Sequence, residues 1–266
     1  MSVFEAFILG MLQGLTEFLP VSSSGHIQIG AYVFGINTSE NLIFTVLVHG
    51  ATVLSTIIVF WKEIKDIASG VLKFKYNEET KFFLYIVVSM IPVGLIGVFY
   101  KTEVEALFDG KIIFVASMLM VTGFLLAATN YIKPRSSSGE LNYIKAFIIG
   151  LAQGLAVLPG ISRSGATIAT GLIVGVDKKQ ATRFSFLMVI IPILGASLLQ
   201  VKDILETPAI TGNTSISALA VGFITALLFG IIACRWMIQI VQKGKLIYFA
   251  IYCFIIASTV LIIQLI

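Results

Sequence analysis

The sequence predicts an all-α polytopic membrane protein with six transmembrane helices and two re-entrant helical hairpins in an inverted-topology repeat. Composition is the first observation: 58% of the 266 residues are hydrophobic, only 12% are charged, and the mean hydropathy is +1.00. A soluble domain of this length needs more charge to cover its surface. The other two observations are six long apolar stretches and two further segments that repeat each other.

Each of the six apolar stretches is long enough to cross the ~30 Å hydrocarbon core of a bilayer as a helix. They are Leu42–Phe60, Phe82–Tyr100, Ile112–Ile132, Phe184–Val201, Ile216–Met237 and Leu246–Ile266. The first, third and fifth loops, counted with Arg235 at the end of the fifth span, hold 15 Lys and Arg residues, and the second and fourth hold 3. The positive-inside rule then places the odd loops in the cytoplasm and both termini outside. The mixed-charge stretch 62–81 is expected to be a short solvated loop.

Segments 3–35 and 141–176 are apolar but are interrupted near the middle by Pro, Gly and Ser. Neither half of either segment is long enough to span, so both are expected to be re-entrant hairpins. They match at an offset of 140 residues, which pairs Gly10 with Gly150, Gln13 with Gln153, Gly25 with Gly165, and Gly35 with Gly175. Residues 1–133 and 141–266 are then two repeats of one membrane domain, each a hairpin plus three spans. Because three is odd, the second copy is inverted.

Inverted repeats place a binding site near the midplane, where broken helices point their ends inward. The breaks here fall at Leu19–Ser24 and Leu158–Ser164. The segments after them begin with Ser and Gly, which are good N-cap residues. Two helix N-termini, each with free N–H groups and a positive dipole end, are therefore expected to face each other as an anion site.

The two hairpins differ in their chemistry. The first carries Glu17, Ser23 and His26, whereas the second has Arg163 at the position of Ser23 and Ala166 at that of His26. Ionisable residues inside a membrane are costly and usually functional. We therefore expect acid–base groups in the first hairpin and an anion clamp in the second.

Gln13 and Glu17 are four residues apart and share one helix face. Together they could hold a cation or orient a water; alternatively, Gln13 only packs and Glu17 loses its charge in a polar pocket. Glu17 lies at a helix C-terminus, where the dipole disfavours a carboxylate. A metal ion or Arg163 nearby is expected to compensate its charge.

Three serines, Ser22, Ser23 and Ser24, precede Gly25 and His26. One serine is expected to be only an N-cap. Another is a candidate nucleophile activated by the imidazole; alternatively, His26 protonates a leaving oxygen or activates a water. The sequence leaves these alternatives open.

Arg163 is the candidate phosphate ligand, because a guanidinium can grip phosphate oxygens with two hydrogen bonds. Neighbouring hydroxyl and N–H groups complete a cradle that lacks a Walker lysine; they belong to Gly160, Ser162, Ser164, Gly165 and Thr167. The alternative is an arginine that extends to lipid headgroups. His49, in the first span, either faces the cavity or is a hydrogen-bonded core histidine.

Two segments, QGLTEFLPVSSSGH at 13–26 and PGISRSGAT at 159–167, closely resemble the motifs of the undecaprenyl-diphosphate phosphatases of the bacitracin-resistance (UppP/BacA) family. The resemblance implies a hydrolase of the bacterial cytoplasmic membrane that converts undecaprenyl diphosphate to undecaprenyl phosphate and inorganic phosphate. Such an enzyme recycles the lipid carrier for cell-wall synthesis and protects against bacitracin. It further implies six spans with two re-entrant helical pairs, and an active site open to the outer face.

Carried over by position, the family's acidic motif falls on Gln13 and Glu17, its serine on Ser23, its histidine on His26 and its arginine on Arg163. The resemblance also implies a divalent cation, Mg or Ca. Because the first acidic position is glutamine here, Gln13, Glu17 and the substrate's diphosphate oxygens would have to hold it.

The expected partners are a polyprenyl diphosphate substrate and membrane lipids, with no nucleic acid; a homodimer is left open. The main rival function is a polyprenyl-phosphate flippase or transporter that uses the same inverted-repeat site. The functional asymmetry of the two hairpins favours the enzyme, since a carrier has less use for a Glu, Ser and His set on one side only.

Overall fold

The computed structural model describes residues 1–34, 42–107, 111–131, 139–206 and 214–265. Every regular element in these ranges is helical. The elements are α1 (Val3–Phe18), α2 (Ser23–Phe34), α3 (Leu42–Val59), α4 (Trp61–Val71), α5 (Glu78–Phe99), α6 (Lys101–Glu105), α7 (Ile112–Ala128), the 3-10 helix η2 (Thr129–Tyr131), α8 (Tyr143–Leu155), α9 (Arg163–Ile173), α10 (Lys178–Met188), α11 (Ile190–Glu206), α12 (Ile216–Gln242) and α13 (Ile247–Leu265).

The chain is a polytopic, all-helical membrane protein. Five helical stretches among the described residues are long and apolar enough to cross a membrane: Glu78–Phe99, Ile112–Tyr131, Lys178–Leu199, Ile216–Gln242 and Ile247–Gln264. They overlap five of the six predicted spans. Gly35, Ile132 and Ile266, which end predicted segments or match across the repeat, lie outside the described residues.

The first predicted span differs most from expectation. It corresponds to α3, and the chain then bends by 76° into α4, so that a sixth crossing exists only if the bent pair counts as one span. The expected solvated loop at 62–81 is wrong, because most of it is helical, in α4 and the start of α5. Ile67 and Gly70 of α4 are buried, and a Cβ on Gly70 would collide with Glu79 of α5. Charges on one face therefore did not prevent α4 from packing through its other face.

Local sequence explains where the first helix starts and stops. Ser2 and Glu5 form a capping box, with Glu5 N donating to Ser2 Oγ at 3.2 Å and Ser2 N donating to Glu5 Oε2 at 2.8 Å. The helix ends before Pro20, since a residue preceding proline avoids the α region. At 16 residues, α1 is about 24 Å long and α2 is shorter still, so neither crosses a bilayer alone.

Glycines let the two hairpins pack tightly against long helices. The first hairpin is α1–α2 and the second is α8–α9. Gly10 of α1 lies against the backbone of Gly222 in α12, so that a Cβ there would meet the Gly222 carbonyl. Gly150 of α8 lies against the backbone of Ser89 in α5 in the same way. The first helix of each hairpin therefore packs on a long helix from the other half of the chain.

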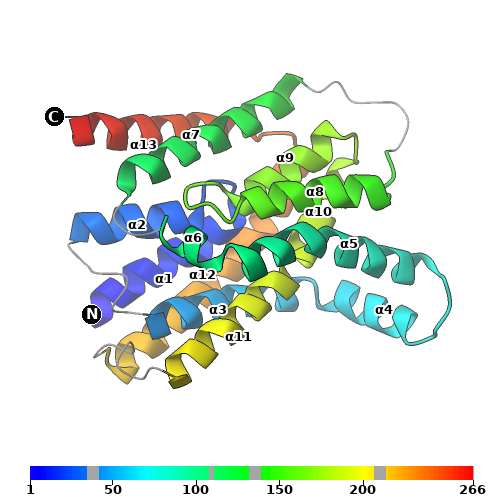
Figure 1. Cartoon of the computed structure of the whole chain (residues 1–266), viewed down its shortest axis with the longest axis horizontal. Coiled ribbons are helices and arrows are strands. Elements are labelled where there is room, and N and C mark those ends of the chain that lie inside the picture. The colour runs from blue at the N-terminus through cyan, green and yellow to red at the C-terminus, as the bar shows by residue number, and fades with distance from the viewer. Residues whose placement is uncertain (35–41, 108–110, 132–138, 207–213, 266) are drawn as a thin grey trace.

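The two hairpins enter the bundle from opposite ends (Figure 1). The first opens toward the end where both termini lie, whereas the second opens toward the end that carries the α4–α5 connection. Their turns meet in the middle of the molecule. The long helices α7 and α13 lie side by side, as do α3 and α11.

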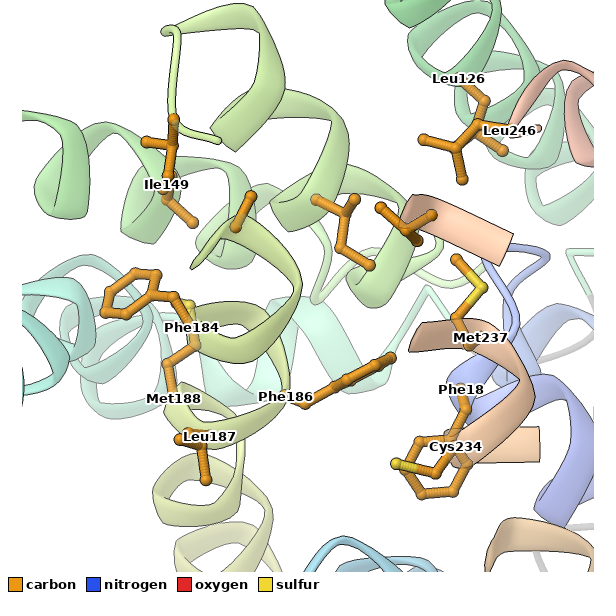
Figure 2. Close-up of a cluster of buried hydrophobic side chains, with 14 of the residues drawn as sticks. Phe18, Leu126, Ile149, Phe184, Phe186, Leu187, Met188, Cys234, Met237 and Leu246 are labelled. Carbon is orange, nitrogen blue, oxygen red and sulfur yellow. The ribbon is translucent and has the colours of Figure 1, made fainter. Parts of the chain in front are cut away.

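An aromatic and sulfur-rich core supports the end of α1 (Figure 2). Phe18 is 3% exposed and meets Phe186 edge to face, with ring centroids 5.8 Å apart. Cys234 and Met237 of α12 complete this part of the core, and both are fully buried. Because Phe18 follows Glu17 directly, packing of its ring fixes the direction of the carboxylate on the last turn of α1.

Candidate active site

Three of the predicted site residues converge on the carboxylate of a fourth, Glu17. Glu17 forms an ion pair through Oε1 with Arg163 Nη2. Its Oε2 accepts hydrogen bonds from Gln13 Nε2 at 3.0 Å and from Ser23 Oγ at 2.6 Å. The Glu17 side chain is 7% exposed and that of Arg163 21% exposed. The predicted proximity of Gln13, Glu17 and Arg163 is thus present, and Arg163 supplies the compensating charge.

The first turn separates the roles of its three serines. Ser22 has a φ of 68°, an unusual backbone conformation for a residue with a side chain. Its Oγ accepts from Gly25 N at 3.2 Å, so Ser22 is the expected N-cap of α2. Ser24 Oγ lies 3.3 Å from Ser22 Oγ. Only the Ser23 hydroxyl reaches the Glu17 carboxylate.

The second turn repeats this cap. Ser162 Oγ accepts from Gly165 N at 3.1 Å at the start of α9, and lies 3.3 Å from Ser164 Oγ. Gly160 has a φ of +97° and lies so close to the Val115 carbonyl that any side chain would collide with it. Glycine at this position is therefore required by the turn itself.

The two turns touch each other. Ser164 Oγ donates to the Leu19 carbonyl at 3.2 Å, and a Cβ on Gly165 would lie 3.2 Å from Pro20 Cβ. A Cβ on Gly25 would lie 3.5 Å from Gly160 Cα. The starts of α2 and α9 are consequently neighbours, as expected for two facing helix N-termini.

Backbone N–H groups at both helix starts have no hydrogen-bond partner among the described residues. They belong to Ser23, Ser24, Arg163 and Ser164. With the Arg163 guanidinium beside them, they are suited to bind phosphate oxygens. Thr167 contributes less directly, because its hydroxyl donates to the Arg163 carbonyl at 2.8 Å within α9.

His26 is not hydrogen-bonded to Ser23. Its Nδ1 lies 2.8 Å from the Ser22 carbonyl oxygen, and its Nε2 lies 2.8 Å from the hydroxyl of Tyr252 in α13. The group that can take the Ser23 proton in this arrangement is Glu17. The geometry therefore does not provide direct activation of Ser23 by the imidazole. The other two alternatives for His26, protonation of a leaving oxygen and activation of a water, remain.

His49 has features of both alternatives, a residue that faces the cavity and a hydrogen-bonded core histidine. Its Nδ1 donates to the Thr45 carbonyl at 2.9 Å within α3, as a core histidine would. The side chain is half-buried, and it is close enough to Glu17 for an electrostatic interaction.

A small, partly open pocket adjoins the Glu17–Arg163 pair. Its other walls are mainly apolar and come from α3, from α10 and α11, and from Phe18; they include Thr52, Val53, Thr56, Phe186, Val189, Ile190 and Ile193. The charged pair thus lies beside apolar surface, a combination that suits an amphiphilic ligand.

Two contacts in the site were not predicted from the sequence. Thr122 of α7 accepts from Ser162 N at 2.9 Å and donates to the Gly160 carbonyl at 3.2 Å, which fixes the second turn. Tyr252 holds His26. Each is a polar group within an apolar span, and that is the signal that could have singled them out.

The residues offer limited coordination for a metal. Gln13 Oε1 is buried without a hydrogen-bond partner, and Glu17 adds its carboxylate. No group of three or more His, Cys, Asp or Glu side chains suited to a metal occurs in the described ranges. Oxygen donors fit Mg or Ca, but both ions need six or more ligands. The residues therefore fit a divalent cation only together with oxygens from the substrate and water.

Sequence comparisons identify the family. The profile described as "Bacitracin resistance protein BacA" matches residues 6–259. This chain belongs to the BacA family. A Bacteroides fragilis protein named undecaprenyl-diphosphatase is 53% identical over 264 residues, covering 99% of both chains. Relatives of the same name from Parabacteroides distasonis and Halothermothrix orenii are 55% and 40% identical, over 95% and 98% of each chain. These names favour the enzyme over the transport alternative.

Proposed function

We propose that this BacA protein hydrolyses undecaprenyl diphosphate to undecaprenyl phosphate and inorganic phosphate. The observation that carries the proposal is the hydroxyl of Ser23 donating to Glu17 at 2.6 Å, while Arg163 binds the other carboxylate oxygen beside two helix N-termini. A nucleophile, a base and an anion clamp are the parts that phosphoryl transfer needs. The names of the relatives supply the substrate.

The proposed reaction begins with the diphosphate bound by Arg163 and the free N–H groups at the starts of α2 and α9. The attacking oxygen is that of Ser23 or of a water bound beside it, and in both cases Glu17 takes the proton. The bond between the terminal phosphorus and the bridging oxygen breaks, and undecaprenyl phosphate leaves. Arg163 stabilises the charge that develops on the transferred phosphoryl oxygens. Where Ser23 is the nucleophile, water then hydrolyses the phosphoserine.

A divalent cation bound through Gln13 Oε1 and the Glu17 carboxylate would neutralise part of the diphosphate charge. The buried, unpartnered oxygen of Gln13 supports this assignment. Chelation is then expected to weaken binding of the substrate.

We further propose six crossings and two re-entrant hairpins related by an inverted repeat, in the bacterial cytoplasmic membrane, with the site open to the outer face. Support comes from the packing of α1 on α12 and of α8 on α5, which is reciprocal. Residues of α5 and α12 are themselves about 140 positions apart. The opposed directions of the two hairpins in Figure 1 agree with this arrangement.

The test is phosphate release from undecaprenyl diphosphate by the purified protein in detergent, with and without a chelator. Wild type is expected to release phosphate and Glu17→Gln to release almost none. Arg183→Ala is the control, since Arg183 stacks on Phe82 at 4.5 Å rather than on the site. No release from folded wild-type protein would contradict the proposal, as would full activity in Glu17→Gln.

A further inference from the structure

The imidazole of His26 is held on both of its nitrogens by groups that play no other part in the proposed reaction. Nδ1 lies 2.8 Å from the Ser22 carbonyl oxygen and Nε2 lies 2.8 Å from the Tyr252 hydroxyl. The two rings are nearly parallel, at 11°, with centroids 5.5 Å apart. His26 is 8% exposed, and the backbone of Val21 is a further polar neighbour of the ring.

The Ser22 carbonyl determines which nitrogen carries the proton. A carbonyl oxygen can only accept, so Nδ1 must be the donor, and the neutral ring then has its lone pair on Nε2. The Tyr252 hydroxyl accordingly donates to Nε2. When Nε2 takes up a proton, the hydroxyl must turn and accept instead. The hydrogen-bond direction at Tyr252 is thus tied to the protonation state of His26.

The α13 helix that carries Tyr252 is attached to the first hairpin at two further points. Cys253 Sγ lies 3.7 Å from the Pro20 carbonyl oxygen, in the turn itself. Gln264 Nε2 donates to the Tyr32 hydroxyl at 3.1 Å, two turns beyond His26 along α2. Tyr252 is 40% exposed although its hydroxyl contacts the imidazole. Tyr252 therefore contacts His26 from α13, a helix whose position relative to the first hairpin is fixed by these two contacts.

We propose that Tyr252 is a positioning residue for His26, and that together with the Ser22 carbonyl it holds the imidazole as the Nδ1–H form, with the Nε2 lone pair accepting a hydrogen bond from the Tyr252 hydroxyl. The proposal rests on the proposed phosphatase function, in which Glu17 takes the proton of the nucleophile. His26 lies about one helical turn after Ser23 on α2. When the Tyr252 hydroxyl turns away from Nε2, this nitrogen can exchange a proton with the leaving oxygen or with water. Tyr252 does not touch the reacting atoms and acts through His26.

The variant Tyr252→Phe tests this, because it keeps the stacked ring and removes only the hydroxyl. A loss in kcat on the order of tenfold is expected, with KM nearly unchanged, since misdirected catalytic groups cost roughly this much. The pH–rate profile is expected to shift along the pH axis as well as fall. In a His26→Gln background, the same substitution should add less than about a twofold effect.

Two tyrosines serve as controls. Tyr248→Phe changes an exposed tyrosine one turn earlier on α13, and Tyr32→Phe removes the other hydrogen bond between α2 and α13. Both are expected to keep the wild-type pH profile. Wild-type kinetics in Tyr252→Phe, or full multiplication of its effect in the His26→Gln background, would overturn the proposal. So would an unshifted profile, which would mark a purely structural role.

A second measurement does not depend on activity. The chain has 2 histidines, so ¹⁵N spectra of histidine-labelled protein can be assigned with a His49→Gln variant. His26 is expected to show the Nδ1–H form, and Tyr252→Phe to move its Nε2 signal, whereas Tyr248→Phe leaves it in place. An unmoved signal refutes the positioning role even in a protein without phosphatase activity. A moved signal in a protein that releases no phosphate would instead count against the proposed function alone.

Discussion

Removing Arg163 should cost this protein both stability and activity, and the two losses should separate. The Glu17 side chain is 7% exposed beside Arg163, and Arg163→Ala leaves its carboxylate with Gln13 and Ser23 as hydrogen-bond partners. Breaking a buried ion pair costs roughly 3–5 kcal/mol, because the remaining charge is uncompensated. The lower end applies here, since two hydrogen bonds still satisfy Oε2 and Arg163 is partly exposed. About 3 kcal/mol corresponds to a Tm lower by roughly 6–12 °C.

The double variant Glu17→Gln with Arg163→Ala removes the uncompensated charge and keeps the size of residue 17. Most of the lost Tm should therefore return, while phosphate release stays on the order of 10³-fold or more below wild type. Thermal unfolding in detergent and phosphate release measure the two effects on the same samples. Arg183→Ala is the matched control and should lose about 1 kcal/mol or less with its cation–π contact to Phe82. A double variant no more stable than Arg163→Ala would refute the reasoning.

Three further outcomes follow from the same contacts. Ser23→Ala should lower kcat by about 100-fold or more at nearly unchanged KM; a rise in KM alone would contradict a role in proton transfer or attack. Gln13→Glu adds a second carboxylate, so half-maximal activity should need about tenfold less Mg or Ca; an unchanged titration would exclude Gln13 from the cation site. Gly150→Ala should lower stability by roughly 1–3 kcal/mol, because its Cβ meets the Ser89 backbone. Gly97→Ala, with nothing within 4 Å of its Cβ, should not.

Local chemistry explains why the breaks and caps of the hairpins could be predicted. Pro20 must end α1, and Ser22 and Ser162 accept from the backbone three residues later at nearly the same distance, 3.2 and 3.1 Å. These effects depend on the nearest few residues, so a sequence carries them. Five of the six spans were predictable for a related reason, since apolar length decides whether a helix can cross a bilayer.

Contacts between distant segments could not be predicted from neighbouring residues in the sequence. The partner of His26 is 226 positions away, and nothing near either residue indicates the pair. The helix α4 was missed because its charges suggested solvent, whereas its packing against α5 depends on Gly70 and Glu79. Glu17 and Arg163 were placed near each other only through the repeat, which made two distant turns equivalent.

The ion pair at the centre of the site joins residues that are synthesised 146 positions apart. When the first hairpin has left the ribosome, Glu17 has no guanidinium beside it, and Leu19 has no serine hydroxyl at its carbonyl. Both are supplied only after the second hairpin has been synthesised. A chain that stops after its first half therefore holds the proposed base, Glu17, without the proposed anion clamp, Arg163. The proposed site is therefore assembled only once both hairpins have been synthesised.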